Sequence, residues 1–182
     1  FELWKSDGSI AGTVMVKDIN PDSGSNAKTM FIGHDALYFS ATNGSSGYEL
    51  FKTDGTEAGT VLVADLYPGY NHSSPDRFNI FNNELYFSAT TASGFELMKT
   101  DGTTAGTVIV KDINLGSGHS YASKTVEFNG ALYFAANDGV NGYALWKTDG
   151  TTEGTALAVD FYSDSSSGSV MHLTVFDDYI YL

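Results

Sequence analysis

Two sets of aspartates recur along this chain at a spacing of about 47 residues, and regularly spaced carboxylates could bind calcium. The first set stands directly before a turn glycine and comprises Asp7, Asp54, Asp101 and Asp149. A calcium cage needs about six to eight oxygen ligands, whereas each turn offers one carboxylate and a few hydroxyls. We therefore expect these aspartates to cap their own turns through hydrogen bonds to the backbone.

The second set of aspartates ends an apolar run in every repeat and comprises Asp18, Asp65, Asp112 and Asp160. Loops rich in glycine, serine and asparagine follow, so one carboxylate and several backbone carbonyls could hold an ion there. Ca²⁺ is therefore the one cofactor that the sequence suggests, and only at this second set. The alternative is that these aspartates cap the strand end or face water.

The loops after the second aspartates differ most between the repeats, and function tends to lie on loops held by a rigid scaffold. They run from Asn20 to Lys28, Tyr67 to Arg77, Asn114 to Lys124, and Tyr162 to His172. Their aromatic and polar side chains could bind sugars or protein surfaces. We predict a ligand-binding role for Tyr67, Tyr70, His72, Arg77, His119 and Tyr121. The alternative is that the variation reflects relaxed constraint.

Two of the predicted ligand residues are histidines that occupy the same place in neighbouring repeats. His72 and His119 each lie seven residues after the second aspartate, and spacing matches them to Ser25 and Ser167 in the other repeats. Two histidines from adjacent repeats with no third in register make a poor zinc site. We therefore interpret them as exposed loop residues.

No catalytic constellation stands out in the sequence. The chain has no cysteine and no Gly-x-Ser-x-Gly nucleophile motif, and spacing singles out no pair of carboxylates for glycoside hydrolysis. We therefore expect that the chain is not an enzyme.

These side chains must be positioned by a unit that the chain repeats. Its most regular segment reads aromatic, Glu or Ala, Leu, apolar, Lys, Ser or Thr, Asp, Gly, in four copies that begin at Phe1, Tyr48, Phe95 and Tyr143. A period of this length indicates supersecondary units that bury their apolar faces against one another.

One repeat contains four short runs rich in aromatic and β-branched residues, which is the composition of strands. In the repeat taken as the type, we predict strands at Arg77–Phe81, Glu84–Ala89, Phe95–Thr100 and Thr107–Ile113. Asn82 and Asn83 suit a tight hairpin between the first two, and the Asp-Gly turn joins the last two. Each repeat should thus be a four-stranded antiparallel meander.

The runs Val14–Val16, Val61–Val63 and Val108–Val110 are apolar throughout, which is typical of a sheet covered on both faces. Stacked four-stranded units of this kind predict an all-β β-propeller built from blades of about 47 residues. Two other folds are less favoured. A two-sheet sandwich would leave one face of every sheet exposed to solvent, and a β-helix, with its short rungs, would not need four strands per repeat.

The expected organisation is a single domain, 1–182, with a half blade at 1–19, blades at 30–66, 78–113 and 125–161, and a half blade at 172–182. If the two half blades join, four blades close into a ring. Otherwise the repeats are an arc of a larger propeller or array, and both alternatives stay open.

The string Glu-Leu-Trp-x-x-Asp-Gly-Thr-x-x-Gly-Thr resembles the ELWxxDGTxxGT repeat, found mostly in large secreted or surface-attached bacterial proteins. The resemblance covers essentially the whole chain and implies a propeller-like fold and no defined enzymatic activity. The main departures are Phe51 and Met98 in place of Trp, and Ala144 in place of Glu. Phe and Met fill similar apolar volume, so the Trp position is expected to serve packing.

The composition limits the partners. A net charge of −13 argues against nucleic acid, and no apolar run is long enough for membrane insertion. The acidic, cysteine-free chain suits a secreted or cell-surface bacterial protein. We expect a non-catalytic extracellular module for adhesion, recognition or structural assembly, whose partners are other proteins, copies of itself or extracellular glycans. The alternatives are a lectin-type module using the variable loops, and a filament-forming subunit joined through open strand edges.

Overall fold

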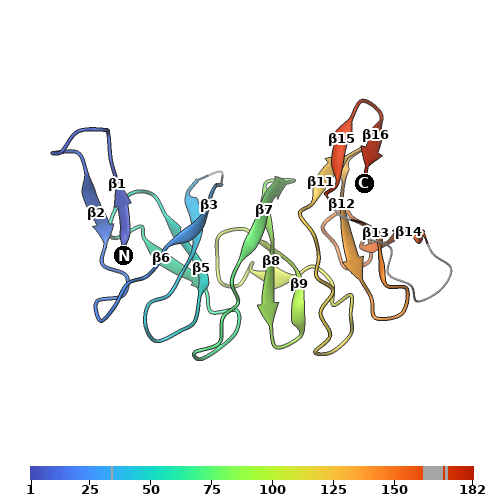
Figure 1. Ribbon diagram of the computed structural model, residues 1–182, viewed down its shortest axis with the longest axis horizontal. Helices are drawn as coiled ribbons and strands as arrows, with labels where there is room; N and C mark the ends of the chain where they lie inside the picture. Colours follow the sequence, from blue (N-terminus) through green and yellow to red (C-terminus); the bar gives the residue numbers. More distant parts are fainter. Residues whose placement is uncertain (34, 162–169, 171) are drawn as a thin grey trace. The chain divides into compact units, whose positions relative to one another are not determined.

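The computed structural model describes residues 1–33, 35–161, 170 and 172–182, and these residues form strands and no helix (Figure 1). Accordingly, no helix in the described part of the chain is able to cross a membrane. The chain divides into two compact units. The first unit comprises Phe1–Asp76 with Gly102–Thr104, and the second comprises Arg77–Asp101 with Ala105–Leu182.

The first unit contains a two-stranded and a four-stranded antiparallel sheet. The two-stranded sheet pairs β1 (Leu3–Lys5) with β2 (Val14–Lys17). The four-stranded sheet has the order β3-β4-β5-β6, with bounds Lys28–Ile32, Leu37–Ala41, Glu49–Thr53 and Val61–Ala64. Since neighbours in sequence are neighbours in the sheet, it is a meander.

The second unit contains two further meanders, the first of which opens with β7 at the boundary between the units. One has the order β10-β9-β8-β7, with bounds Asp76–Phe81 (β7), Glu84–Thr91 (β8), Gly94–Thr100 (β9) and Val108–Ile109 (β10). The other has the order β11-β12-β13-β14, with bounds Val126–Phe128, Ala131–Asn137, Tyr143–Thr148 and Ala156–Val159. A hairpin follows, β15 (Thr174–Phe176) with β16 (Tyr179–Tyr181). The predicted all-β chain of four-stranded antiparallel units is confirmed.

The hairpins at Asn82–Asn83, Asn129–Gly130 and Asp177–Asp178 use the left-handed backbone that their residue types favour. The dihedral φ is +48° at Asn82, +66° at Asn83, +49° at Asn129 and +49° at Asp177. Asn and Asp adopt this conformation more readily than other residues with a side chain. The tight turns are therefore set by local chemistry.

The last strand of the repeat is shorter than the sequence suggests. Thr107–Ile113 was expected to be extended, but β10 covers only Val108–Ile109. Val110 still donates its N–H to Leu97 O at 2.9 Å, whereas Ile113 donates its N–H to the Glu96 carboxylate at 3.3 Å. The chain leaves the strand ladder because a side chain takes the place of the neighbouring strand as acceptor.

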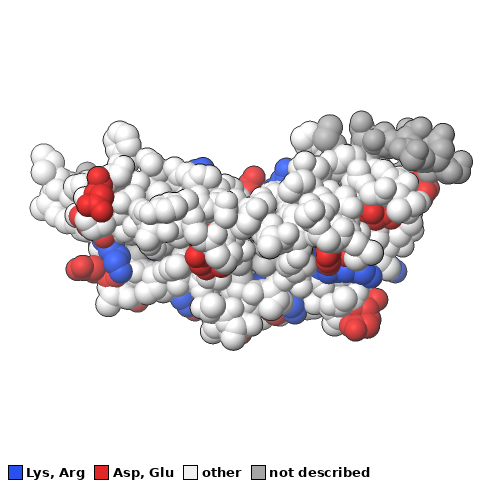
Figure 2. All heavy atoms as spheres, turned by 90° about the horizontal axis from the view of Figure 1, so that it is seen from below, with Lys and Arg blue, Asp and Glu red and all other residues white. Residues whose placement is uncertain are grey.

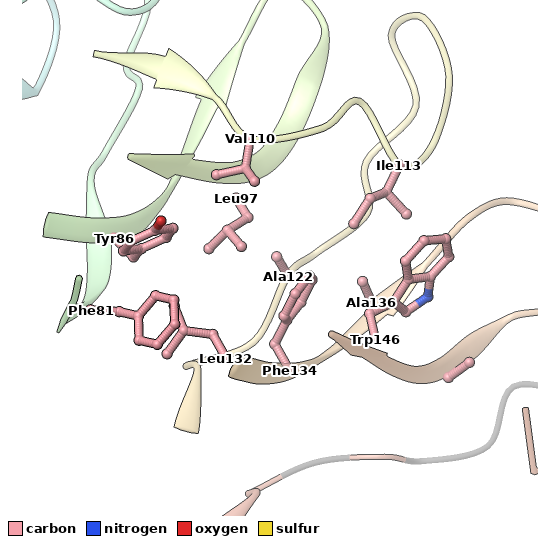
Figure 3. Packing of buried hydrophobic residues seen from close by; sticks show 11 residues of the cluster. Phe81, Tyr86, Leu97, Val110, Ile113, Ala122, Leu132, Phe134, Ala136 and Trp146 are labelled. Atoms are coloured by element: carbon pink, nitrogen blue, oxygen red, sulfur yellow. The ribbon is translucent and has the colours of Figure 1, made fainter. Parts of the chain in front are cut away.

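The core of the second unit is built from aromatic and aliphatic side chains of successive repeats, as Figure 3 shows for Phe81, Tyr86, Phe134 and Trp146. The indole Nε1 of Trp146 is buried and has no hydrogen-bond partner. Phe51 and Met98, which replace Trp in their repeats, are also buried, with 4% and 3% of their surface exposed. This burial without an indole partner indicates that the position serves packing.

Successive repeats also meet through a tyrosine of the second strand and the glycine of the Asp-Gly turn. Tyr38 places its hydroxyl where a β-carbon of Gly102 would lie, and Tyr86 does the same at Gly150. Both tyrosines are buried, with 3% and 1% of their surface exposed. The turn glycines thus have two roles, since they adopt φ near +90° and admit the tyrosine.

Replacing Gly102 by alanine is expected to destabilise the protein more than replacing Gly55. Both glycines have φ near +88°, so both substitutions carry the same backbone strain of about 1–2 kcal/mol. A β-carbon at Gly102 would also collide with Tyr38, whereas nothing lies within 4 Å of one at Gly55. Urea unfolding in dilute solution should show a further loss of about 1–3 kcal/mol for Gly102→Ala. Equal losses would contradict a tyrosine–glycine contact.

Candidate functional site

The glutamate of the repeated motif is buried and holds the loop that follows the fourth strand. Glu49, in β5, has none of its surface exposed. Its carboxylate accepts the N–H of Leu66 at 2.8 Å, the N–H of Ser73 at 3.1 Å and the Ser73 hydroxyl at 2.6 Å. One side chain therefore connects the third strand to both ends of the loop.

Two other repeats have the same arrangement. Glu96 accepts the N–H of Ile113 at 3.3 Å and of Ser120 at 2.8 Å. Glu2 accepts the N–H of Ile19 at 2.9 Å and of Ser25 at 2.8 Å. In the fourth repeat Ala144 stands at this position, and most of the loop, residues 162–169, lies outside the described residues. We call the three carboxylates with their donors the glutamate staples.

The environments of the staples shift their pKa values in different directions. Burial raises the pKa of Glu49 and of Glu96, with a small contribution from Asp65 or Asp112, and outweighs the hydrogen bonds. Burial also opposes ionisation of Glu2, but there the hydrogen bonds from Ser25 and the backbone prevail and the pKa is lowered.

The two loop histidines also accept a backbone hydrogen bond. His72 Nδ1 accepts the N–H of Tyr48 at 3.0 Å, and His119 Nδ1 accepts the N–H of Phe95 at 2.8 Å. Each Nδ1 is therefore unprotonated in this structure, and the imidazole orders the start of the third strand. Both side chains remain exposed on their other side.

The glutamate staples correct the alignment of the loops. Spacing alone matched Ser25 to His72, whereas Ser25 donates to Glu2 as Ser73 donates to Glu49. Gly24 is therefore the counterpart of His72, because the first loop is one residue shorter. Ser167, the other residue matched by spacing, lies outside the described residues.

The structure divides the predicted ligand residues between the two units. Tyr67, Tyr70 and His72 belong to the first unit, where the His72 ring lies 5.2 Å from that of Tyr48 and the Tyr70 side chain is 80% exposed. The Lys28 ammonium lies 3.9 Å from the centre of the Tyr48 ring. In the described part of the chain, no ring contact joins Tyr67 or Tyr70 to Tyr48 or His72.

The second unit brings together Arg77, His119 and Tyr121. The Arg77 guanidinium lies 5.3 Å from the centre of the Phe95 ring and donates to the carbonyl of Ala122 at 2.6 Å. The Tyr121 ring lies 6.0 Å from that of Phe95 and 5.2 Å from that of His119. A cation, an imidazole and two aromatic rings thus adjoin one another.

Tyr143 completes this group. Its pKa is raised by burial and by the nearby Tyr121, while the nearby Arg77 acts in the opposite direction. The aromatic cluster is therefore defined as Arg77, Phe95, His119, Tyr121 and Tyr143. Phe95 and Tyr143 were not predicted as site residues. Both residues stand at the first position of the motif, which is aromatic in every copy. From a single sequence, such a residue is interpreted as a packing residue.

Two residues of the aromatic cluster have a strained backbone. The dihedral φ is +59° at Arg77 and +50° at Tyr121. The residues that follow the staple serine in the other repeats, Asn26 and Ser74, have φ of +47° and +46°. Residues with large side chains rarely adopt this conformation, and such strain concentrates at functional sites.

The turn aspartates accept hydrogen bonds from their own turns. Asp54 Oδ1 accepts the N–H and the hydroxyl of Thr56 at 2.8 and 2.7 Å, and Asp7 and Asp149 do the same with Ser9 and Thr151. These hydrogen bonds lower the pKa of all three carboxyls. At Asp101 a β-carbon on Gly106 would meet the carboxylate, as at the other three turns.

The second set of aspartates adds no further ligands for a cation. Among the described residues, no group of three or more Asp, Glu or His side chains could hold a metal ion. Asp112 Oδ2 accepts the N–H of Gly116 at 3.1 Å, and its Oδ1 is buried without a partner. Asp18, Asp65 and Asp160 are exposed. These donors do not make a calcium cage, and the calcium role stays a prediction.

The charged side chains on the face shown in Figure 2 lie scattered among other residues, without a continuous basic patch on that face. The expectation that the chain does not bind nucleic acid, which rests on the net charge of −13, stays a prediction.

No protein-family model matches this chain, and neither does any curated protein. Among the solved structures that resemble it is a novel alpha-L-arabinofuranosidase (CtGH43) from Clostridium thermocellum. The TM-score is 0.39 and the identity 13%, over 91% of this chain and 64% of that chain. This chain therefore spans less than two thirds of that protein.

The comparison corrects one prediction. The chain was expected not to be an enzyme, and that expectation is withdrawn, because a solved structure that resembles the chain is an enzyme. The physical reason is that carboxylates from distant repeats can meet in a folded protein without any signature in their spacing.

The glutamate staples predict a pH dependence of stability. Because the pKa of Glu49 and of Glu96 is raised from 4.5, their contribution to the free energy of unfolding is complete below about pH 4.5. It is lost as the pH rises through the higher folded-state values. In the double variant Glu49→Gln/Glu96→Gln, this pH-dependent loss of stability should be absent. The difference in the free energy of unfolding between the wild type and the variant should therefore shrink as the pH rises.

Urea unfolding of both proteins from about pH 4 to pH 8 measures this difference. The aspartates with lowered pKa contribute in the opposite direction but equally in both proteins, so they cancel. Parallel pH profiles would show that the two glutamates do not titrate with folding.

Proposed function

We propose that this chain is an extracellular tandem-repeat module of the ELWxxDGTxxGT kind, which acts in adhesion, recognition or structural assembly. The supporting observation is that three repeats use the same glutamate staple, while the loops that the staples hold differ in residue type and in length. A constant scaffold with variable loops is the arrangement that recognition proteins use.

The meanders are proposed to be blades of a β-propeller, or of an arc of similar blades. Their strands are largely buried, as in β8 and β13, which agrees with sheets covered on both faces. The number of blades and the closure of a ring remain part of the proposal, since β1 with β2 and β15 with β16 each form a two-stranded sheet in the described residues.

For recognition we propose carbohydrate binding by the aromatic cluster of the second unit. The exposed face of Tyr121 offers an apolar surface for the C–H groups of a sugar ring, and 49% of this residue is exposed. His119 adjoins it, Arg77 lies over the neighbouring Phe95 ring, and both side chains carry donors suited to hydroxyl groups. The net charge of −13 favours a neutral sugar over a phosphorylated or nucleic-acid ligand.

Replacing Tyr121 by asparagine is expected to remove carbohydrate binding without harming the fold. Asparagine tolerates the left-handed backbone at this position, where Asn26 is the counterpart in the first repeat. Losing the aromatic face should weaken the affinity about tenfold or more. A glycan array with the wild-type chain identifies the sugar, and calorimetry with that sugar measures the loss.

The matched control is Leu115→Ala, since Leu115 is 83% exposed in the same loop but lies outside the aromatic cluster. It should bind as the wild type does. A glycan array without saturable binding, or equal binding by Tyr121→Asn, would overturn the carbohydrate proposal.

A further inference from the structure

The first unit has an apolar pocket of about 300 Å³ whose lining shares no residue with the aromatic cluster. It is lined by residues of β1, β2, the start of β4 and the turn after β5, namely Leu3, Trp4, Lys5, Val16, Leu37, Thr53, Asp54 and Gly55. The Lys5 ammonium donates to the Gly55 carbonyl at 2.7 Å beside it. The pocket is therefore bounded by the edge strand β1 and an Asp-Gly turn.

The same place in the next two repeats is filled by a tyrosine. The hydroxyl of Tyr38 lies against Gly102, and that of Tyr86 lies against Gly150. At the other two turn glycines of this series, Gly8 and Gly55, nothing lies within 4 Å of a β-carbon, and Gly55 is the one that lines the pocket. The pocket is thus shaped for a second-strand tyrosine of a neighbouring repeat.

We propose that Tyr181 of a second copy of this chain fills the pocket, and that β16 of that copy pairs with β1. Tyr181 follows Ile180 in β16 as Tyr38 follows Leu37 in β4. Tyr181 is therefore the counterpart of Tyr38 and Tyr86 in its own repeat. Whereas Tyr38 and Tyr86 are buried, Tyr181 is 51% exposed.

The register of the complete sheets fixes how the two strands meet. The second-strand tyrosine always pairs with the motif lysine, as Tyr38 with Lys52, Tyr86 with Lys99 and Tyr133 with Lys147. By the same rule Tyr181 lies opposite Lys5, and Ile180 lies opposite Ser6. The two copies would complete a sheet of order β15-β16-β1-β2, which is the order of the three meanders.

The two edges have the surfaces that such pairing requires. Trp4 in β1 is 57% exposed, and Leu182, which would lie opposite it, is 50% exposed. Pairing also satisfies backbone N–H and C=O groups along both edges. Apolar burial and strand hydrogen bonds therefore act together in this interface.

The contact joins two different surfaces, so each added copy presents a new free edge and the chains can form rings or filaments. The inference rests on the assembly role proposed above and names its partner. It does not involve the aromatic cluster, so assembly and carbohydrate binding can fail independently.

Disulfide trapping tests the register, because the chain has no cysteine of its own. A chain with Ile180→Cys is mixed with a chain with Ser6→Cys under mild oxidation, which leaves Tyr181 intact. Directly opposed strand residues lie within disulfide range, so a mixed dimer is expected on a non-reducing gel. The control pairs Ile180→Cys with Lys5→Cys, whose side chains would point to opposite faces and should cross-link far less.

A chain carrying both Ile180→Cys and Ser6→Cys shows whether the pocket is filled by Tyr181 of the same chain or by Tyr181 of a second copy. An intrachain disulfide in dilute solution would mean that the chain closes on itself, and would overturn pairing between copies. Failure of the mixed pair to cross-link beyond the Lys5 control would overturn the proposed register and pocket.

Light scattering across a range of concentrations provides a second measurement. The wild type should associate, and Tyr181→Ala should weaken the association about tenfold or more. Tyr179→Ala is the matched control, since the other repeats have Ala36, Glu84 and Ala131 at this position. Gly55→Ala should weaken association as Tyr181→Ala does. A wild type that stays monomeric at all concentrations, or equal association by Tyr181→Ala, would overturn the proposal.

Discussion

The glutamate staple is the interaction on which each repeat depends. A carboxylate without exposed surface is unfavourable unless hydrogen bonds compensate it, and Glu49 receives two from backbone N–H groups and one from the Ser73 hydroxyl. The donors stand at the end of the fourth strand and just after the loop. The staple therefore sets where the loop begins and ends, whatever residues lie between.

The same constraint positions the aromatic cluster. Next to the staple, the N–H groups of Ser120 and Tyr121 both reach the carbonyl of Phe95, at 3.1 and 3.2 Å. This holds Tyr121 in its left-handed conformation and against the Phe95 ring. In the first unit, Asn26 and Ser74 hydrogen-bond to the corresponding carbonyls of Phe1 and Tyr48. One backbone position after the staple thus carries a different side chain in each repeat, at a fixed place.

The strands and turns could be predicted because they depend on residue types close together in the sequence. The glutamate staples and the arrangement of the aromatic cluster were missed because they depend on contacts between residues far apart in the sequence. The residue types of Asn82 and Asn83 predict their hairpin. In contrast, most of the groups that donate to the staple glutamates are backbone N–H groups, and these are present in almost every residue type. A glutamate inside a strand ordinarily reads as facing solvent. Spacing paired Ser25 with His72 because the first loop is one residue shorter than the second. Sequence spacing counts residues, whereas the staple fixes the two ends of the loop whatever its length. Phe95 was missed since an aromatic residue in a strand reads as core.

Within a repeat, the turn that bounds the pocket and the loop that carries the aromatic residues follow opposite ends of the strands, and this separates their roles. In β4 and β5, Tyr38 pairs with Lys52 beside the Asp-Gly turn, whereas Glu49 stands at the other end of β5, where the loops are held. A repeat can therefore change its loop residues without disturbing the tyrosine and glycine that join it to its neighbour. Assembly through the turn end leaves the loop end accessible, so joining copies would multiply binding surfaces rather than cover them.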